Sequence, residues 1–206
     1  DVLVYVVGDF SGTVSVGGYT INAGGLAHDG FIAVFKLNGD FYSFQNLSCR
    51  VGAGPCSTPA SGEVSVSGVG ADTLGNVWTS LDFSGTLGCN EDLCVTSTPG
   101  AHEIFIQKRP SGSDPKWVCY LETEGDALSM DIVADGLGAS YVVGSHEGPL
   151  EIPGFGPMNE DGDNKTGFVV KLGSNDDDTA CSADWAIGID CAGVDDSVNR
   201  VAVDSS

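Results

Sequence analysis

The stretch Asp9-Phe10-Ser11-Gly12-Thr13-Val14 recurs as Asp82-Phe83-Ser84-Gly85-Thr86-Leu87, with five consecutive identities. A third copy begins at Tyr141-Val142-Val143-Gly144, which matches Tyr5-Val6-Val7-Gly8. Self-similarity at a spacing of tens of residues is typical of repeat architectures. We therefore expect three copies of one structural unit, built on these matched segments.

The third copy keeps the glycines and the apolar alternation of the first while its polar residues change. Gly12, Val14, Val16 and Gly18 correspond to Gly148, Leu150, Ile152 and Gly154. Alternation with a period of two indicates β-strands, and frequent glycine indicates tight turns. Upstream, Ala71-Asp72-Thr73-Leu74-Gly75-Asn76 matches Ala134-Asp135-Gly136-Leu137-Gly138-Ala139.

Each copy is expected to form four short antiparallel strands, with a hairpin between the second and third. The first strands are expected at Glu63–Val69, Ala127–Ala134 and Ser197–Asp204. The second strands are expected at Val2–Gly8, Asn76–Asp82 and Ala139–Ser145. The third are expected at Phe31–Leu37, Glu103–Lys108 and Gly167–Leu172, and the fourth at Phe41–Asn46, Lys116–Glu122 and Asp184–Ile189. Repeated four-stranded units indicate propeller blades.

The fold prediction is therefore an all-β chain, with one β-propeller-like repeat domain over residues 1–206. The repeats are expected at about 1–62, 63–126 and 127–196, and residues 197–206 are expected to start a further blade. Propellers typically have about four to eight blades, so three four-stranded antiparallel blades predict an open ring or a stack. Its exposed sheet edge would be completed by further blades of a longer parent chain or by neighbouring copies.

These segments resemble the β-propeller repeat known as the seven-bladed, or SBBP, repeat. Its units contain a Gly-Asn-Val-aromatic run, paired glycines, an Asp-Ala-Phe-Val-Ala-Lys-Leu-like strand and an aromatic strand. The matching residues here are Asp72, Gly75-Asn76-Val77-Trp78, Gly12-Thr13, Gly17-Gly18, Gly24-Gly25, Asp29-Gly30-Phe31, Lys36-Leu37, Gly167–Leu172 and Trp185. The resemblance implies a secreted or surface-exposed protein, often one involved in adhesion. It implies no common active site.

The composition is strongly acidic, with a formal net charge of −21 and only 8 lysines and arginines. Such a chain repels phosphate backbones and anionic lipid surfaces, which argues against nucleic-acid binding and membrane association. No apolar stretch is long enough for a transmembrane helix. The chain begins at Asp1, directly before a strand-like run, as expected for a processed protein or for a piece of a longer one.

Six of the seven cysteines fall into close pairs that bracket loop-like segments. We expect local disulfides that pair Cys49 with Cys56, Cys89 with Cys94, and Cys181 with Cys191. Such bridges imply an oxidising compartment, and their spacing, with no histidine nearby, argues against zinc. Cys119 lies in an apolar run and is expected to be a buried free thiol, with an inter-chain bridge as the alternative.

Two sequons, at Asn46 and Asn164, predict N-glycosylation and point to the same secreted, extracellular or cell-surface location. The acidic loop at 159–164 contains Asp161 and Asp163, whose spacing suits calcium as a cofactor. The loop lacks the distal glutamate of an EF-hand, and a solvated loop is the favoured interpretation.

No catalytic motif is present, so we predict a protein that is not an enzyme. His28 and His102 precede corresponding strands, and local hydrogen bonding is favoured over metal binding or catalysis.

The expected function is an extracellular structural repeat protein, a subunit or segment of a fibre, appendage or surface assembly, with strand complementation between units. Its partners would be copies of itself or further blades. The alternative is a cell-surface adhesin or glycan-binding propeller module, in which Trp78 and Tyr19 would stack on sugars, although core roles are favoured for both. A secreted hydrolase or lyase on a propeller is a third possibility, which no constellation of residues supports.

Overall fold

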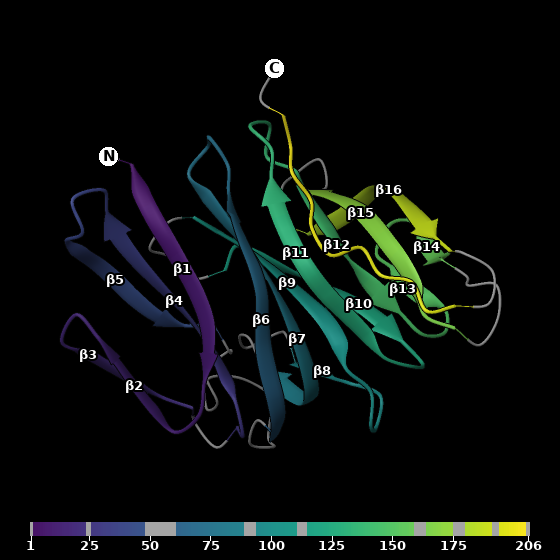
Figure 1. Ribbon diagram of the computed structural model, residues 1–206, viewed down its shortest axis with the longest axis horizontal. Helices are drawn as coiled ribbons and strands as arrows, with labels where there is room; N and C mark the ends of the chain where they lie inside the picture. The colour runs from purple at the N-terminus through teal and green to yellow at the C-terminus, as the bar shows by residue number, and fades with distance from the viewer. Residues whose placement is uncertain are drawn as a thin grey trace. The chain divides into compact units, whose positions relative to one another are not determined.

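The computed structural model describes residues 2–23, 26–47, 61–88, 94–110, 115–158, 164–174, 180–190 and 194–204. Over these residues the chain is all-β, with 67% in strands, no helix and several antiparallel sheets, none of which closes on itself. Figure 1 labels the strands and colours them along the chain from the N-terminus to the C-terminus. The all-β prediction is therefore confirmed.

The chain divides into two compact units, 1–66 with 83–100, and 67–82 with 101–206. The boundary falls inside two long strands, β6 (Ser61–Ala71) and β7 (Asn76–Gly88), so both strands contribute to both units. The expected repeat boundaries near residues 62, 126 and 196 stay predictions.

The first sheet contains three strands in the order β1-β4-β5: β1 (Leu3–Phe10), β4 (Asp29–Lys36) and β5 (Phe41–Asn46). A separate hairpin, β2 (Thr13–Val16) with β3 (Tyr19–Asn22), occupies the expected excursion between the second and third strands. Its turn uses Gly17 and Gly18, both at positive φ, a conformation that glycine adopts without steric penalty.

The second sheet places β6, β7, β9 (Glu103–Pro110) and β10 (Trp117–Thr123) side by side in that order. Two further strands extend it beyond β10, namely β13 (Leu150–Ile152) and β14 (Gly156–Met158), and β8 (Cys94–Thr96) pairs with β7. The β13–β14 hairpin comes from the third expected repeat. Its pairing with the end of β10 was not predicted.

The third sheet has the order β11-β12-β15-β16, made of β11 (Ala127–Ala134), β12 (Ser140–His146), β15 (Thr166–Ser174) and β16 (Cys181–Ile189). Its strand order is the one expected for a repeat, and it matches the order of β6, β7, β9 and β10. The predicted positions of the strands in all three sheets are confirmed to within a few residues, with β7 running several residues longer than expected.

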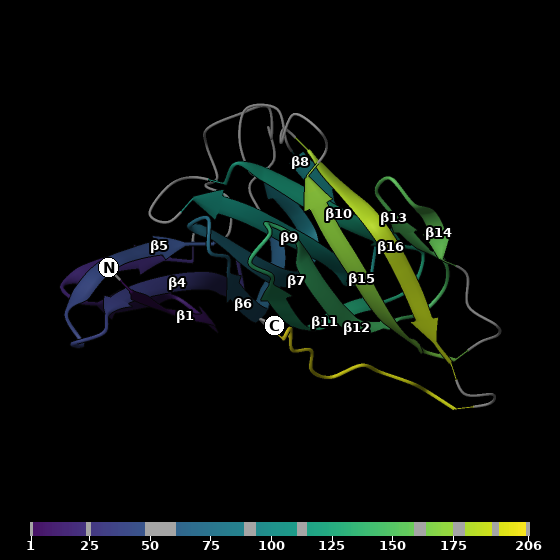
Figure 2. The same ribbon diagram turned by 90° about the horizontal axis from the view of Figure 1, so that it is seen from above.

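One expected strand is wrong. Residues 197–204 form no strand and run as an extended segment beside β11 and β12 (Figures 1 and 2). A strand needs a neighbour that accepts and donates along its whole length. The 194–204 segment has only separate contacts of this kind, described below.

The turns between the first two strands of the second and third sheets share one device. Asp72 accepts hydrogen bonds from the backbone N–H groups of Leu74 and Asn76, at 2.9 and 2.8 Å. Asp135 accepts the same bonds from Leu137 and Ala139, at 2.8 and 3.0 Å. A carboxylate that binds backbone N–H groups two and four residues ahead fixes a tight turn. This explains why the matched segments both carry aspartate there.

The core of the second unit lies between the second and third sheets. The second sheet contributes Trp78, Ile104, Ile106, Trp117, Cys119 and Leu121. The third contributes Ala127, Ile132, Val142, Phe168, Val170, Leu172 and Ala183, and the β13–β14 hairpin adds Leu150, Ile152 and Met158. Two four-stranded groups with the same strand order are therefore packed face to face.

Candidate interaction surfaces

A lysine between two aromatic rings is buried in the second sheet. Trp117 pairs with Lys108 across β10 and β9, and the Lys108 Nζ lies 5.1 Å from the ring centroid of Trp78 and 5.6 Å from that of Trp117. The two indoles meet edge to face at 5.1 Å. Trp78 is fully buried, which confirms the favoured core role and rules out stacking on a sugar. The group instead faces the third sheet and supports the core.

The third sheet carries a similar group, on the face that points away from the second sheet. Lys171 pairs with Tyr141 on one side and with Trp185 on the other, and the two aromatic rings lie 6.0 Å apart. All three side chains are half-buried. The Lys171 Nζ lies 2.7 Å from Asp184 Oδ2, and its hydrogen bond with that carboxylate raises the pKa of Lys171. We call Tyr141, Val169, Lys171, Trp185, Ile187 and Ile189 the outer face, since they share one side of this sheet.

The first sheet presents an apolar side of its own. Residues paired directly across strands point to the same side, which groups Val4 with Phe35 and Phe41, and Val6 with Ala33 and Phe44. Ring contacts link Phe35 with Phe41 and Phe31 with Phe44, at centroid distances of 6.0 and 5.6 Å. We call Val4, Val6, Phe31, Phe35, Phe41 and Phe44 the valine–phenylalanine face. Val4 and Val6 are exposed, and the four rings are half-buried.

Tyr42 is exposed and lies outside the regular pairing of β5. Its pairing position is skipped, because β5 bulges between the pairs Val34↔Ser43 and Phe35↔Phe41. Sheet three bulges at the same place, where Asp184 is skipped between Lys171↔Trp185 and Leu172↔Ala183. The bulged residue is exposed in both sheets. By register, Tyr42 therefore corresponds to Asp184, and Ser43 corresponds to Trp185.

A buried carboxylate joins the second and third sheets. Asp82 Oδ1 accepts hydrogen bonds from the backbone N–H and the hydroxyl of Ser129, at 2.7 and 2.8 Å. Its other oxygen accepts one from the Ser67 hydroxyl at 2.8 Å. Burial raises the pKa of Asp82 to about 6, and the hydrogen bonds and the nearby His102 oppose part of that rise.

The 194–204 segment lies against the third sheet on the side away from β9 and β10 (Figure 2). Val198 donates its backbone N–H to the Gly144 carbonyl at 3.1 Å, and Val201 donates to Asp131 Oδ2 at 3.2 Å. The Arg200 guanidinium donates to the Met130 carbonyl at 3.0 Å. These contacts cover β11 and β12 and leave Ile187 and Ile189 exposed.

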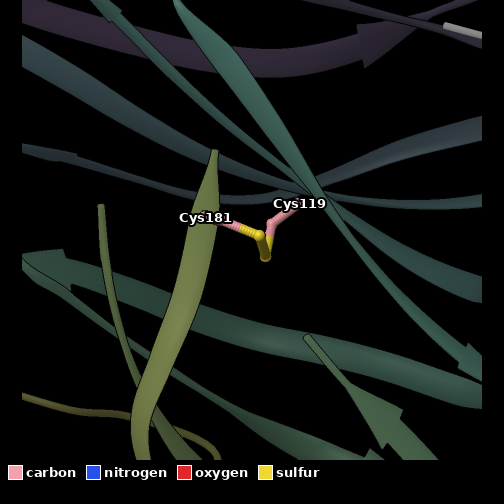
Figure 3. The surroundings of a disulfide bond; sticks show 2 residues. All are labelled: Cys119 and Cys181. Carbon is pink, nitrogen blue, oxygen red and sulfur yellow. A yellow bond between two sulfur atoms is a disulfide. The ribbon is translucent and has the colours of Figure 1, made fainter. Parts of the chain in front are cut away.

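The cysteines pair differently from the prediction where the structure describes them. Cys119 on β10 and Cys181 on β16 form a disulfide (Figure 3). The expected Cys181–Cys191 pair and the free thiol at Cys119 are both wrong. Local spacing pointed to a short loop, whereas the bridge joins the second and third sheets across their shared core. Cys49, Cys56, Cys89 and Cys191 lie outside the described residues, and Cys94 lies in β8.

The sequons and histidines occupy structured positions. Asn46 ends β5, and its amide donates to the buried Asp29 carboxylate at 2.7 Å. Asn164 is half-buried before β15. The His102 ring lies 3.3 Å from Asp126, and the Nδ1 atom of His146 lies 2.7 Å from the Gly148 carbonyl oxygen. The His146 contact is local, whereas the His102 contact joins residues 24 positions apart, so it is not the local hydrogen bond expected for His102. The backbones of His28 and Glu63 form an isolated parallel β-bridge.

The calcium candidates Asp161 and Asp163 lie outside the described residues. Within the described ranges, no group of three or more His, Cys, Asp and Glu side chains is arranged to hold a metal ion. None of the described segments forms a helix that is long and apolar enough to span a membrane.

Comparison with known protein families finds no family model that matches the chain. Comparison with curated proteins likewise finds no match. The functional argument therefore depends on the surfaces themselves.

The lysine–aromatic groups were missed at the level of sequence. Lys108 and Lys171 lie in the third strands of their sheets, nine and fourteen residues before a tryptophan in the next strand. Their common feature, a lysine paired directly with that tryptophan, becomes visible only when the strands are in register.

Proposed function

We propose that this chain is an extracellular structural repeat protein, a subunit or segment of a fibre, appendage or surface assembly that grows by strand complementation. The observation that carries the proposal is the edge of the first sheet, where no first strand lies beside β1 among the described residues. In the second and third sheets a first strand, β6 or β11, lies beside the second strand, β7 or β12. In the first sheet β1 corresponds to that second strand, and it ends the described sheet.

The 194–204 segment supplies the sequence of a first strand. Val201-Ala202-Val203-Asp204 aligns with Ile132-Val133-Ala134-Asp135 of β11. Its position also corresponds. Val201 aligns with Ile132, and Asp131 aligns with Gly68. Val201 contacts Asp131, just as Ile132 lies against Gly68. A Cβ placed on Gly68 would lie 2.9 Å from the Ile132 nitrogen. These correspondences support residues 197–204 as the start of a first strand, to which a second strand such as β1 of another copy would add.

The same contacts support the propeller-like interpretation and the resemblance to the SBBP repeat, because sheets with one strand order stack face to face. The extracellular location is supported by the Cys119–Cys181 disulfide, which is compatible with an oxidising compartment. The high negative charge is compatible with solubility outside the cell.

Negative-stain microscopy and multi-angle light scattering of the purified chain test this function. We expect filaments, rings or a concentration-dependent series of oligomers. A synthetic peptide of residues 197–206 should shorten the assemblies by occupying β1, and a scrambled peptide should leave them unchanged. A monodisperse monomer at every concentration would contradict the proposal.

A second candidate function is glycan binding by a cell-surface adhesin. Tyr19 is exposed and stacks on Phe41 at a centroid distance of 5.1 Å, which is a platform on which a sugar ring can lie. A glycan array read with calcium and with chelator tests it, and binding that Tyr19→Ala abolishes would support this function over the structural one.

A further inference from the structure

The outer face of the third sheet corresponds, residue for residue, to a core surface of the second sheet. Trp117, Cys119 and Leu121 pair with Lys108, Ile106 and Ile104. Trp185, Ile187 and Ile189 pair with Lys171, Val169 and Gly167 in the same register. The two lysines and the two tryptophans therefore occupy equivalent places, and the residues that follow them do so as well.

The burial of these equivalent residues differs sharply. Cys119 and Leu121 are 1% and 0% exposed, because the third sheet covers them. Ile187 and Ile189 are 54% and 44% exposed. Large aliphatic side chains on a regular strand are thus left open at the positions that a neighbouring sheet covers in the core.

The valine–phenylalanine face corresponds to the surface that provides this cover. Gly8 pairs with Phe31 and Val6 with Ala33, as Gly144 pairs with Phe168 and Val142 with Val170. In both sheets the phenylalanine ring packs against the glycine. A Cβ added to Gly8 would lie 3.1 Å from the Phe31 ring, and one added to Gly144 would lie 2.9 Å from the Phe168 ring. The shared bulge places Phe35 in the position of Leu172.

The burial of these two equivalent surfaces also differs. Val142, Phe168, Val170 and Leu172 are all fully buried against the second sheet. Val6, the equivalent of Val142, is 42% exposed, and Val4 beside it is 41% exposed. One chain therefore carries both halves of an interface whose complete version already exists in the core of its second unit.

We propose that the outer face of one copy binds the valine–phenylalanine face of a second copy, with the same strand-on-strand packing that joins the second and third sheets. This inference rests on the proposed function and names the surfaces that it uses. The occupant is a second copy, since the matching half is encoded in the same chain. Because the two halves differ, the contact is head-to-tail. Such a contact does not end at a dimer but continues from copy to copy into a ring or a filament.

The charge of the chain gives the contact a salt dependence. Copies with a net charge of −21 repel one another, while the valine–phenylalanine face carries no charged side chain. Salt screens repulsion between exposed charges beyond a Debye length of about 8 Å at physiological ionic strength. Assembly by an apolar contact of this kind becomes stronger as salt is added.

Complementing variants test the proposal by sedimentation velocity. Val6→Asp removes one half of the contact and Ile187→Asp removes the other, and both sites are exposed in the folded monomer. Each variant alone is expected to associate at least tenfold more weakly than the wild type. Mixed in equal amounts, the two form a 1:1 dimer that grows no further, because each contributes its intact half. Matched controls are Leu37→Asp and Leu137→Asp, at exposed sites outside both faces, which assemble like the wild type.

The outcomes separate the two proposals. If the wild type assembles and both aspartate variants assemble equally well, the faces named here are wrong while the assembly function stands. If the variants fail alone and also fail when mixed, the head-to-tail pairing is wrong. If the wild type remains a monomer at high concentration and high salt, both proposals are overturned.

Discussion

The Asp82 carboxylate on β7 accepts two hydrogen bonds from Ser129 on β11, one from the backbone N–H and one from the hydroxyl. This contact joins the second strand of one sheet to the first strand of the next. It lies next to the sheet-to-sheet packing that we propose to recur between copies, so its properties bear on how tightly neighbouring sheets are held.

We expect the stability of the chain to depend on pH through Asp82. Its folded-state pKa of about 6 exceeds the ordinary value of 3.8. A raised carboxyl pKa contributes stability that is fully present below pH 3.8 and is lost as the pH rises through 6. The full difference amounts to about 3 kcal/mol, at about 1.4 kcal/mol for each unit of pKa.

Urea denaturation at a series of pH values measures this effect, with Asp82→Asn as the matched comparison. The wild type should gain stability relative to Asp82→Asn as the pH falls from 6 to 4. Subtracting the variant removes the contribution of the other acidic groups. Parallel stability profiles for the two proteins would show that Asp82 does not titrate in this range.

Reduction of the Cys119–Cys181 bridge should lower stability substantially. The bridge closes a loop of 62 residues, and the loss of such a constraint costs about 4 kcal/mol in the chain-entropy treatment. The double variant Cys119→Ala/Cys181→Ala should therefore unfold at a lower urea concentration than the oxidised wild type. Alkylated peptide mapping provides the control: if Cys181 is found joined to Cys191, the bridge assigned here is incorrect.

Replacing Thr79 by valine should stabilise the chain by about 1 kcal/mol. The Thr79 hydroxyl is fully buried, and no hydrogen-bond partner for it lies among the described residues. The aligned residues in the other copies are Val6 and Val142, which indicates that valine fits the site. Thermal unfolding measures the change. Ser67→Ala is the contrasting control, because it removes a bond to Asp82 and should destabilise. Loss of stability in Thr79→Val would reveal a bound partner for the hydroxyl.

Substitution of Gly144 by alanine should severely destabilise the third sheet. The added Cβ would lie 2.0 Å from the Leu128 carbonyl oxygen and 2.9 Å from the Phe168 ring. Gly8→Ala should cost less, since its nearest neighbour is the ring of Phe31, at 3.1 Å. Gly136→Ala is the control, because its nearest atom lies 3.6 Å away. Equal stability of the three variants by urea titration would contradict this packing.

The sequence predicted the strands well because they follow local rules. The alternation of apolar and polar residues and the glycine turns depend only on residues close together in the sequence. The corresponding aspartates Asp72 and Asp135 likewise mark equivalent turns. The order of strands within each sheet followed from hairpin connections. The features that the sequence did not predict all depend on contacts with residues that are distant in the sequence.

Three features were beyond sequence reasoning for that reason. The Cys119–Cys181 bridge requires two sheets to be stacked before the sulfurs can meet. The Ser197–Asp204 segment has the composition of a strand but, among the described residues, only scattered hydrogen-bond partners. The bulges at Tyr42 and Asp184 each insert one unpaired residue into a fourth strand, which changes the side on which the residues beyond it lie.

Hydrogen–deuterium exchange on dilute and concentrated wild-type protein tests the central claim most directly. If the outer face binds the valine–phenylalanine face of another copy, the backbone amides of residues 2–8 and 185–189 gain protection together as the concentration rises. The turn around Leu137 should exchange at the same rate throughout. Protection that does not change with concentration in either strand, or that appears in only one of them, would contradict the account.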